Sequence, residues 1–356
     1  MDFNLTEDRQ MLADTLGRFL TEQYPIEHRV GVAYEAPYHD PEIWDQLSEL
    51  GALYALAPES VGGMGGSGFD ISVVFDAFGR ALCPEPMLGA LMASRLLEAA
   101  GADQEALLSG STKYAVAITE LDAPYALEQI GTEARATKTS FCLSGRKSTV
   151  YGGQVADVFL VAAKFGESLN VFSVRASDAN VTGYGMIDGG GAAEVLFDDT
   201  PATLILENAE AALQESINAG IVALCAEAVG AMDVVHSVTV DYLKQRKQFG
   251  VPIGQFQVLQ HRAVDMLTEI EQARSITIKA AAELGGTAAS RYTSMAKNLI
   301  GRAARLVAEE SIQMHGGIAM TWEYSVSHYA KRLVMLDAQL GDTDYHLSRI
   351  MNSYAA

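Results

Sequence analysis

The sequence lacks the features by which several classes of protein are recognised. Its three cysteines lie far apart and none stands in a CxxC or Cys/His spacing, so neither a metal site nor a disulfide framework is expected. This cysteine usage favours a reducing compartment. No apolar run is expected to reach the roughly 18 residues of a membrane span. The start, MDFNLTEDRQ, is acidic and has no apolar core, which argues against a signal peptide and for the cytoplasm.

Basic residues are scarce as well. The chain has 25 Lys and Arg against 45 Asp and Glu, a net charge of −20. This balance disfavours nucleic acid and anionic membranes as partners, because both call for clustered basic surface. The few cations do include one cluster, made of Lys244, Arg246 and Lys247. Such a cluster is typical either of a local anion site or of a helix end whose dipole favours cations, and the charges alone leave both interpretations open.

The 356 residues predict two or three domains. Residues 1–112 carry helical patterns, with Thr6 as one N-cap and Asp40 followed by Pro41 as another helix start. Residues 113–206 change to short β-prone segments separated by Gly, Asn and Asp, which predict a small antiparallel β domain.

Residues 207–356 return to a helical pattern. Long periodic stretches cover 211–245, 257–284, 288–314 and 326–336, and short glycine-containing turns separate them. Such stretches predict a C-terminal four-helix bundle. The expected fold class is therefore α+β, in the order helical, β, helical.

Residues 242–257, YLKQRKQFGVPIGQFQ, suit the binding of an anionic cofactor. The segment ends one helix with cations, turns at Gly250 and Pro252, and starts another helix near Gln255. Arg246 offers a forked, charge-assisted donor that matches a pyrophosphate better than a lysine would. Gln257 offers amide donors and acceptors for ribose or adenine groups.

A second segment, QMHGG at 313–317, has similar chemistry. Gln313 again offers an amide. Gly316 and Gly317 have no Cβ and allow close approach of the backbone to a ligand. The two glycines equally suit a helix C-cap and turn.

The helical–β–helical order, with RKQFG at 246–250, GQFQ at 254–257 and QMHGG at 313–317, resembles the acyl-CoA dehydrogenase family over essentially the whole chain. Each motif alone is a weak signal, whereas their joint order and spacing is a strong one. The resemblance implies FAD as the cofactor, α,β-dehydrogenation of an acyl-CoA thioester, and an electron-transferring flavoprotein as acceptor. It also implies a tetramer in which these motifs reach the FAD of a neighbouring protomer. The implied FAD contacts are Arg246, Gln248, Phe249, Gln257, Gln313, Gly316, Gly317 and Thr119.

The segments that hold the flavin ring in this family are changed. Family members usually have TEPGAGSD after the first strand of the β domain, and this chain has TELDAPY at 119–125. Thr119 and Glu120 are kept, but the glycine-serine turn is missing. A WIT-type segment corresponds to KSTVYGG at 147–153, which has no tryptophan.

The catalytic base is changed too. Removal of the proton α to the thioester needs a carboxylate. The family places a glutamate either before the final helix, which falls near Asp342 here, or on the long helix before RxxFG, which falls at Gly220. Glycine has no carboxylate. Asp342 is one methylene shorter than glutamate and equally suits an N-cap of a helix starting near Thr343. Glu227 is a weaker candidate that is expected to be paired or to face an interface.

Three hypotheses follow. In the first, the chain is the smaller subunit of a heteromeric α2β2 acyl-CoA dehydrogenase that acts on a bulky, steroid-like acyl-CoA; residues 321–332, TWEYSVSHYAKR, resemble the matching segment of steroid-type subunits. In the second, it is a self-sufficient homotetramer with Asp342 as base. In the third, it is a flavin-free structural subunit. A flavin oxidase or monooxygenase on the same fold is a further alternative.

Overall fold

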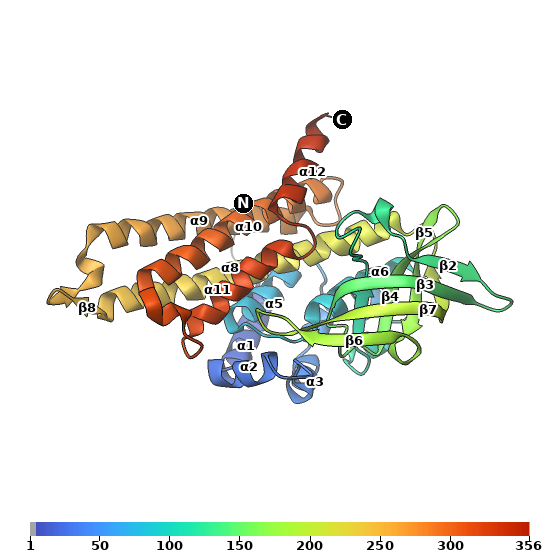
Figure 1. Cartoon of the computed structure of the whole chain (residues 1–356), viewed down its shortest axis with the longest axis horizontal. Coiled ribbons are helices and arrows are strands. Elements are labelled where there is room, and N and C mark those ends of the chain that lie inside the picture. The colour runs from blue at the N-terminus through green and yellow to red at the C-terminus, as the bar shows by residue number, and fades with distance from the viewer. Residues whose placement is uncertain (1–4, 356) are drawn as a thin grey trace. The chain divides into compact units, whose positions relative to one another are not determined.

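The structure is a computed structural model that describes residues 5–355 (Figure 1). The chain forms two compact units, each built from separated segments. One unit comprises Met1–Glu27, Ile71–Cys83 and Ile221–Ala356, and the other comprises His28–Asp70 and Pro84–Gly220. The predicted division into domains 1–112, 113–206 and 207–356 stays a prediction.

The first unit is helical. It contains the four long helices that the sequence predicted for the C-terminal part, each ending within about one residue of the expected boundary. Its helices are α1 (Glu7–Gln23), most of α5 (Gly68–Ala81), most of α8 (Glu210–Gln245), α9 (Gln257–Glu283), α10 (Ala289–His315), α11 (Ser325–Met335) and α12 (Thr343–Ala355). Thr6 caps α1 through its side chain, as predicted.

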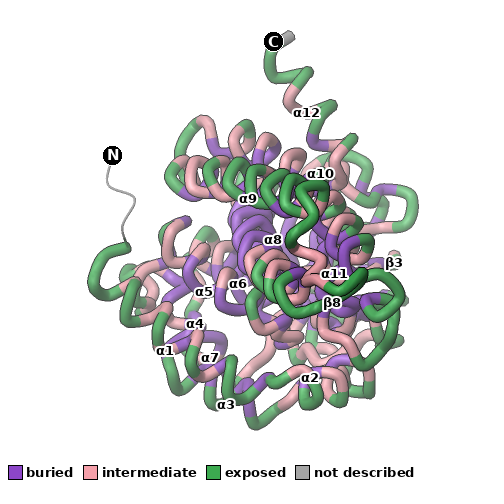
Figure 2. The backbone as a smooth tube through the Cα atoms, turned by 90° about the vertical axis from the view of Figure 1, so that its left-hand side faces the viewer, coloured by how far each residue is buried: buried purple, intermediate pink, exposed green. Residues whose placement is uncertain are grey.

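Helix α8 lies at the centre of this unit and is buried along most of its length (Figure 2). It contains an 18-residue window with a mean hydropathy of 1.6, long and apolar enough to cross a membrane by length and composition alone. The expectation that no apolar run approaches a membrane span was therefore wrong. Because 72% of this window is buried inside the protein, the apolar run is explained by core packing.

Two glycines bring α5 and α8 into close contact. A Cβ on Gly79 would lie 1.9 Å from the carbonyl oxygen of Glu227, and one on Gly230 would lie 2.3 Å from that of Asp76. Each helix thus offers its glycine to the backbone of the other, a spacing that any larger residue excludes.

The second unit is built on a seven-stranded sheet in the order β1-β4-β2-β3-β7-β5, with β6 paired to β7. Strand β5 pairs with both β7 and β4, so the sheet closes on itself around a buried apolar core. The strands are β1 (Tyr114–Ala117), β2 (Glu133–Ala136), β3 (Phe141–Tyr151), β4 (Val158–Phe165), β5 (Ser168–Arg175), β6 (Asn180–Gly185) and β7 (Gly191–Leu206).

The sheet corrects the prediction of a purely antiparallel domain. Most pairs are antiparallel, but β1 and β2 both run parallel to β4. The sequence did not predict β2 and β6, because β2 is largely exposed and β6 contains glycine.

Short helices complete this unit. Asp40 caps α3 by accepting from the backbone N–H of Glu42 at 3.0 Å, as predicted. The helices are α2 (Ile26–Ala33), α3 (Pro41–Glu49), α4 (Ala52–Ala55), α6 (Met87–Ala99) and α7 (Glu105–Leu108).

Candidate functional site

The cation-rich corner is a tight hairpin at one end of the helical unit (Figure 1). After α8 ends at Gln245, strands β8 (Lys247–Gln248) and β9 (Val251–Pro252) pair around a two-residue turn. Both turn residues, Phe249 and Gly250, have positive φ, as a type I′ hairpin turn requires. The turn is closed further by the N–H of Ile253, which donates to the carbonyl oxygen of Arg246 at 2.8 Å.

This hairpin presents its predicted contact residues to the surface. Arg246 and Gln248 are exposed, and Phe249 is 91% exposed. Within residues 5–355, no carboxylate lies within ion-pair distance of the Arg246 guanidinium. A bulky residue with a φ of 54° is uncommon and unfavourable. The Phe249 ring meets the ring of Phe256 edge-on, at a centroid distance of 6.3 Å, and is otherwise largely exposed.

The second motif lies at the end of α10. Gln313 is exposed on the last turn, and Gly316 ends the helix with a φ of 71°, which favours glycine. Gly317 has neither a positive φ nor an atom within 4 Å of the position of its Cβ. Gly316 therefore acts as the C-cap that the sequence offered as an alternative. Gly317 leaves open space beside the backbone, which suits the approach of a ligand.

Two contacts join α8 and α9, on either side of the hairpin, to the last turns of α10. Tyr242, in the last turn of α8, donates from its hydroxyl to the carbonyl oxygen of His315 at 3.2 Å, and the two rings lie 4.5 Å apart. Arg262 of α9 makes a two-pronged ion pair with Glu310 of α10, at 2.5 and 3.0 Å. Gln257, the first residue of α9, is exposed.

The segment around Thr119 belongs to the β unit and is rigidly closed. Glu120 and Ala123 bond each other's backbone across a turn. The carboxylate of Glu120 accepts from the N–H of Gly131 at 2.7 Å, from the hydroxyl of Thr132 at 2.6 Å and from Nζ of Lys147 at 2.7 Å. Glu120 thus anchors the turn that replaces the glycine-serine segment of the family.

Lys147 is completely buried on β3 and donates also to the carbonyl oxygen of Ile118 at 3.0 Å. Burial lowers the pKa of Lys147 to about 8, against the opposing charge of Glu120. Burial alone would raise the pKa of Glu120, but the charge of Lys147 and the hydrogen bonds it receives outweigh burial and lower it.

A carboxylate occupies the segment that would lie beside a flavin ring. Ser148 and Thr149 form an irregularity in the pairing of β3 with β7, and the N–H of Ser148 donates to the carbonyl oxygen of Thr119 at 2.9 Å. The structure therefore brings the two changed segments together. Glu194 of β7 accepts from the hydroxyl of Ser148 at 3.0 Å and from the N–H of Thr149 at 3.3 Å. These donors are already used within the chain, and the same carboxylate also accepts from Nε of Arg146 at 2.9 Å.

Asp342 caps α12. Its Oδ1 accepts from the N–H of Tyr345 at 2.8 Å, the role that the sequence offered as its alternative. Gly220 is buried within α8. Glu227 is paired, as expected, through two hydrogen bonds from Arg332 at 2.6 and 2.8 Å. His328 is buried, and its Nε2 donates to the carbonyl oxygen of Trp322 at 2.8 Å.

The loop that carries Asp342 is fixed to α10 by a buried lysine. Nζ of Lys297 donates to the carbonyl oxygens of Asp337 and Gly341, at 2.8 and 2.7 Å. Burial lowers the pKa of Lys297 to about 8. From the other side, Nε2 of His346 donates to the carbonyl oxygen of Leu340 at 3.0 Å. The position of Asp342 is therefore determined by internal contacts.

His346 makes the stability of this loop depend on pH. Because Nε2 donates, the lone pair is on Nδ1, which is buried and has no hydrogen-bond partner among the described residues. Burial lowers the pKa of His346 from 6.5 to about 4, equivalent to roughly 3 kcal/mol. The unfolded chain binds this proton more readily, so the stabilisation is present above pH 6.5 and is lost as pH falls towards 4.

Urea unfolding at pH 7 and pH 5 checks this prediction. Relative to His346→Gln, whose amide can still donate to Leu340, the wild type is expected to lose more stability on acidification. His261→Gln, at an exposed position of α9, serves as the control and should keep the wild-type dependence. Equal acid sensitivity of wild type and His346→Gln would contradict the assignment.

Sequence reasoning assigned no role to Lys147, Glu194, Lys297 or Tyr242, although Lys147 and Tyr242 lie in segments that it singled out. Lys297 did carry a signal, since it falls on the apolar face of its helical pattern with Ile300 and Ala304. Glu194 carried none, because its partners lie more than 40 residues away along the chain.

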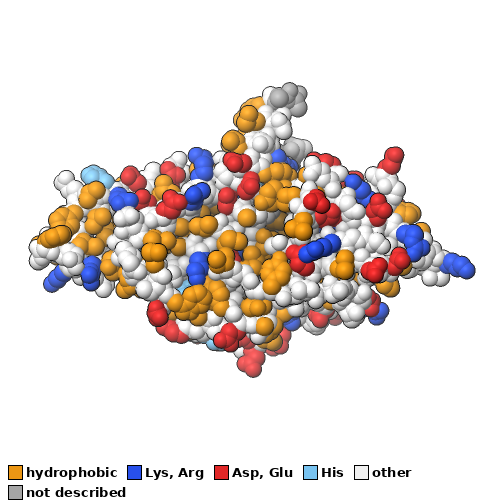
Figure 3. Space-filling model, viewed as in Figure 1, with side chains coloured by type: hydrophobic (Ala, Val, Ile, Leu, Met, Phe, Trp, Pro, Cys, Tyr) orange, Lys and Arg blue, Asp and Glu red, His pale blue; other side chains and the backbone are white. Residues whose placement is uncertain are grey.

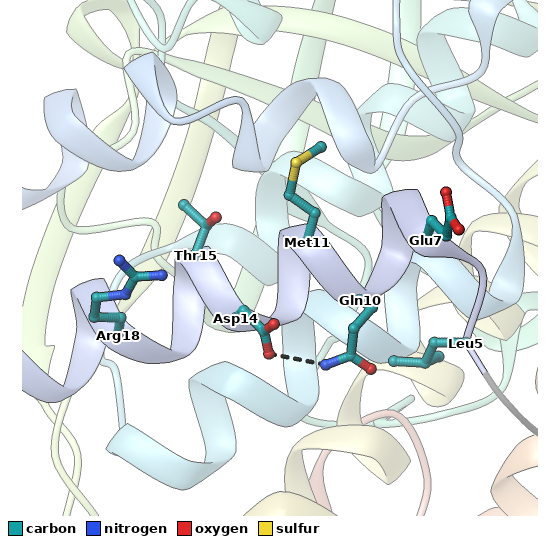
Figure 4. Close-up of a pocket in the computed structure, with 7 residues that line it drawn as sticks. All are labelled: Leu5, Glu7, Gln10, Met11, Asp14, Thr15 and Arg18. Atoms are coloured by element: carbon teal, nitrogen blue, oxygen red, sulfur yellow. Dashed lines mark hydrogen bonds between the residues drawn. The ribbon is translucent and has the colours of Figure 1, made fainter.

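The residues of the helical unit fit the predicted FAD. A guanidinium that is exposed and has no carboxylate partner within residues 5–355, an open face at Gly317 and two exposed amides match a pyrophosphate with its attached nucleoside. The flavin-ring segment fits poorly, because Glu194 takes its donors. A shallow pocket along α1 includes none of the predicted FAD contacts (Figure 4). Within it, Nε2 of Gln10 donates to Oδ1 of Asp14 at 2.8 Å.

Comparison with known proteins agrees with the motifs. The models of the acyl-CoA dehydrogenase N-terminal and C-terminal domains match residues 6–108 and 211–355. Acyl-CoA dehydrogenase IpdE2 of Mycobacterium tuberculosis is 31% identical over 333 residues, covering 92% of this chain and 91% of that protein.

Two solved structures share the fold at 24% identity and a TM-score of 0.91. They are the ChsE4-ChsE5 complex of Mycobacterium tuberculosis, covering 100% of this chain and 99% of that chain, and the steroid ACAD Tcur3481-Tcur3483, covering 98% of each. The chain therefore belongs to the acyl-CoA dehydrogenase family, an FAD-dependent class of oxidoreductases, as its motifs predicted.

Proposed function

We propose that this chain is the smaller subunit of a heteromeric acyl-CoA dehydrogenase and that it completes an FAD site held mainly by a related partner subunit. The observation that carries the proposal is a contrast between two groups of residues. The guanidinium of Arg246 is exposed and has no carboxylate partner among the described residues, whereas Ser148 and Thr149 donate to Glu194. Contacts that would serve a neighbour's cofactor are available, and those that would serve the chain's own flavin ring are taken.

When bound, FAD supplies the oxidising power for removal of a hydride from the β carbon of the substrate. Arg246 holds the pyrophosphate through its forked donors. The open backbone at Gly316 and Gly317 lies against the nucleoside end. Gln257 and Gln313 offer amides to its ribose and adenine, and Gln248 and Phe249 complete the exposed edge. Thr119 stays a predicted contact, and its carbonyl oxygen accepts from the N–H of Ser148.

The partner subunit also supplies the base. Asp342 is used as the N-cap of α12, and Glu227 is held by Arg332. A general base needs a carboxylate free to reach the α proton of the substrate, and neither group is free.

The surface of the helical unit supports association with a related subunit. Helix α9 exposes Val258, Val264 and Leu267, and Val264 is 59% exposed. A groove lined by Val264, Leu267, Ile276 and Leu299 runs beside it. Hydrophobic side chains gather around the end of the helical unit that carries the β8–β9 hairpin, with Lys and Arg beside them (Figure 3). Exposed apolar surface of this kind is typical of a protein interface.

The substrate class follows by similarity. The ChsE4-ChsE5 structure is a complex of two differently named chains, and Tcur3481-Tcur3483 is called a steroid ACAD. We therefore assign to this chain a heterotetramer that oxidises the CoA thioester of a bulky, steroid-like acid in the cytoplasm. An electron-transferring flavoprotein is its expected electron acceptor.

Asp342→Asn tests where the base lies. Asparagine caps a helix as well as aspartate does but has no basic carboxylate, so the fold is preserved while the proposed alternative chemistry is removed. The assembly is expected to keep its turnover within about 2-fold, because the base comes from the partner. Turnover is measured with the CoA thioester of a steroid side-chain acid and ferrocenium as acceptor.

The opposite outcome supports a self-sufficient homotetramer. If Asp342 were the base, the same substitution would lower kcat by roughly 10²- to 10⁴-fold at unchanged thermal stability. Asp344 is exposed and lies two residues after Asp342, in the first turn of α12. Asp344→Asn therefore controls for a general loss of negative charge at this end of the helix.

A further inference from the structure

Three aromatic rings from different parts of the helical unit form a cluster at the junction of the two cofactor motifs. The His315 ring contacts Tyr242, at a centroid distance of 4.5 Å and a tilt of 33°, and Tyr324, at 5.2 Å and 58°. Tyr242 belongs to the last turn of α8, His315 is the last residue of α10, and Tyr324 precedes α11. The aromatic cluster therefore joins three helices at one point.

The hydrogen bonds define the state of the histidine. Nδ1 of His315 donates to the carbonyl oxygen of Ser311 at 2.8 Å, which leaves the lone pair on Nε2. Nε2 is buried and has no hydrogen-bond partner among the described residues. Burial lowers the pKa of His315, so the ring is neutral at physiological pH. A neutral ring packs against the two tyrosines without the desolvation of a charge.

A continuous series of contacts runs from one motif to the other through Tyr242 and His315. The N–H of Arg246 donates to the carbonyl oxygen of Tyr242 at 2.8 Å. The hydroxyl of Tyr242 donates to the carbonyl oxygen of His315 at 3.2 Å. His315 is followed directly by Gly316 and Gly317. Two hydrogen bonds and one aromatic contact, between Tyr242 and His315, thus link Arg246 to the two glycines.

We propose that the aromatic cluster of Tyr242, His315 and Tyr324 is a positioning device that sets the spacing between the Arg246 hairpin and the glycines at the end of α10. The proposal rests on the proposed function, in which both motifs bind one FAD. A dinucleotide spans a fixed distance between its pyrophosphate and its nucleoside end, so two motifs on separate helices must be held at a matching separation. Aromatic rings can hold this separation at low entropic cost, since each side chain has only two torsions. His315 and Tyr242 are positioning residues, which act on the cofactor through Arg246.

A double-mutant cycle on FAD affinity tests the proposal. FAD is stripped from the assembly in which the full-length chain purifies and is titrated back into wild type, His315→Ala, Arg246→Ala and the double variant. We expect His315→Ala to weaken FAD binding by roughly 5- to 10-fold when Arg246 is present and by less than about 2-fold when it is absent. His315→Phe, which keeps a ring, is expected to restore most of the affinity.

Tyr242→Phe gives a second cycle if His315→Ala fails to fold. It removes only the hydroxyl that donates to His315, and it should weaken FAD binding by roughly 3-fold in the presence of Arg246 and by a negligible factor without it. A purely structural role would lower the affinity by the same factor in both backgrounds, and that result would overturn the proposal while Arg246 still counts as a cofactor contact. If Arg246→Ala itself left the affinity unchanged, the proposed function would fall together with the positioning role.

Discussion

Replacing Arg246 with alanine is expected to weaken FAD binding to the purified assembly by roughly 10- to 100-fold, because charge-assisted hydrogen bonds contribute about 1.5–3 kcal/mol. The guanidinium is exposed at the hairpin and has no carboxylate partner among the described residues, so its removal breaks no ion pair inside the chain. The folded state should therefore be nearly as stable as before. FAD content after gel filtration and the dissociation constant from flavin fluorescence measure the effect.

Two further variants make this result specific. Arg246→Lys keeps the charge but loses the planar fork, so it should restore only part of the affinity. Arg305→Ala removes an exposed arginine of α10 that pairs with Glu309, and it should leave FAD binding unchanged. Equal losses for Arg246→Ala and Arg305→Ala would mean that net charge, and not the hairpin, governs binding.

Lys147→Met is expected to produce the largest loss of stability, about 3 kcal/mol of unfolding free energy. The substitution keeps the length of the side chain but removes the charge that pairs with Glu120. The carboxylate of Glu120, only 12% exposed, then loses its cation, and the carbonyl oxygen of Ile118 loses its donor. A lower urea midpoint at pH 7 is the expected observation.

A second substitution separates the charge from the packing. Glu120→Gln added to Lys147→Met removes the unpaired carboxylate and should recover part of the stability, because a buried pair is harmed most when one charge remains. Lys138→Met, at an exposed position before β3, is the control and should change little. A Lys147→Met protein within about 0.5 kcal/mol of wild type would show that the pair is not important for the fold.

Local sequence signals predicted the helical part well. The caps at Thr6 and Asp40 are formed by their own side chains, and α9 and α10 follow long helical periodicities that need no partner to be recognised. Long-range pairing was not predictable in this way. The parallel alignment of β1 with β4 depends on which strands meet in space, and the same alternating pattern fits either direction.

The candidate site divides along the same line. The residue types at Arg246, Gly316 and Gly317 predicted a cofactor surface because their chemistry is local. Asp342 had two possible roles in the sequence, and only its bond to the N–H of Tyr345 distinguishes the cap from an unengaged carboxylate. The hydrogen bonds from Ser148 and Thr149 to Glu194 depend on the register of β3 against β7. No short sequence motif encodes that register, so these bonds could not be predicted.

The pairing of Glu194 with Ser148 and Thr149 supports the proposal that a partner subunit holds the flavin ring. A flavin ring that bonded to this segment would have to displace an internal carboxylate from two donors. The Arg246 hairpin has no such internal competitor among the described residues. Ser148 and Thr149 therefore have donors that are already used, whereas the donors of Arg246 are available to a cofactor. Both groups lie in segments that correspond to cofactor-binding segments of the family.

The FAD content of the full-length chain, purified alone and with the product of the neighbouring gene, tests the central claim most directly. We predict that the chain alone carries little flavin and has no acyl-CoA dehydrogenase activity, and that the co-purified assembly carries both. One FAD for every chain, with full activity in the absence of any partner, would contradict the account.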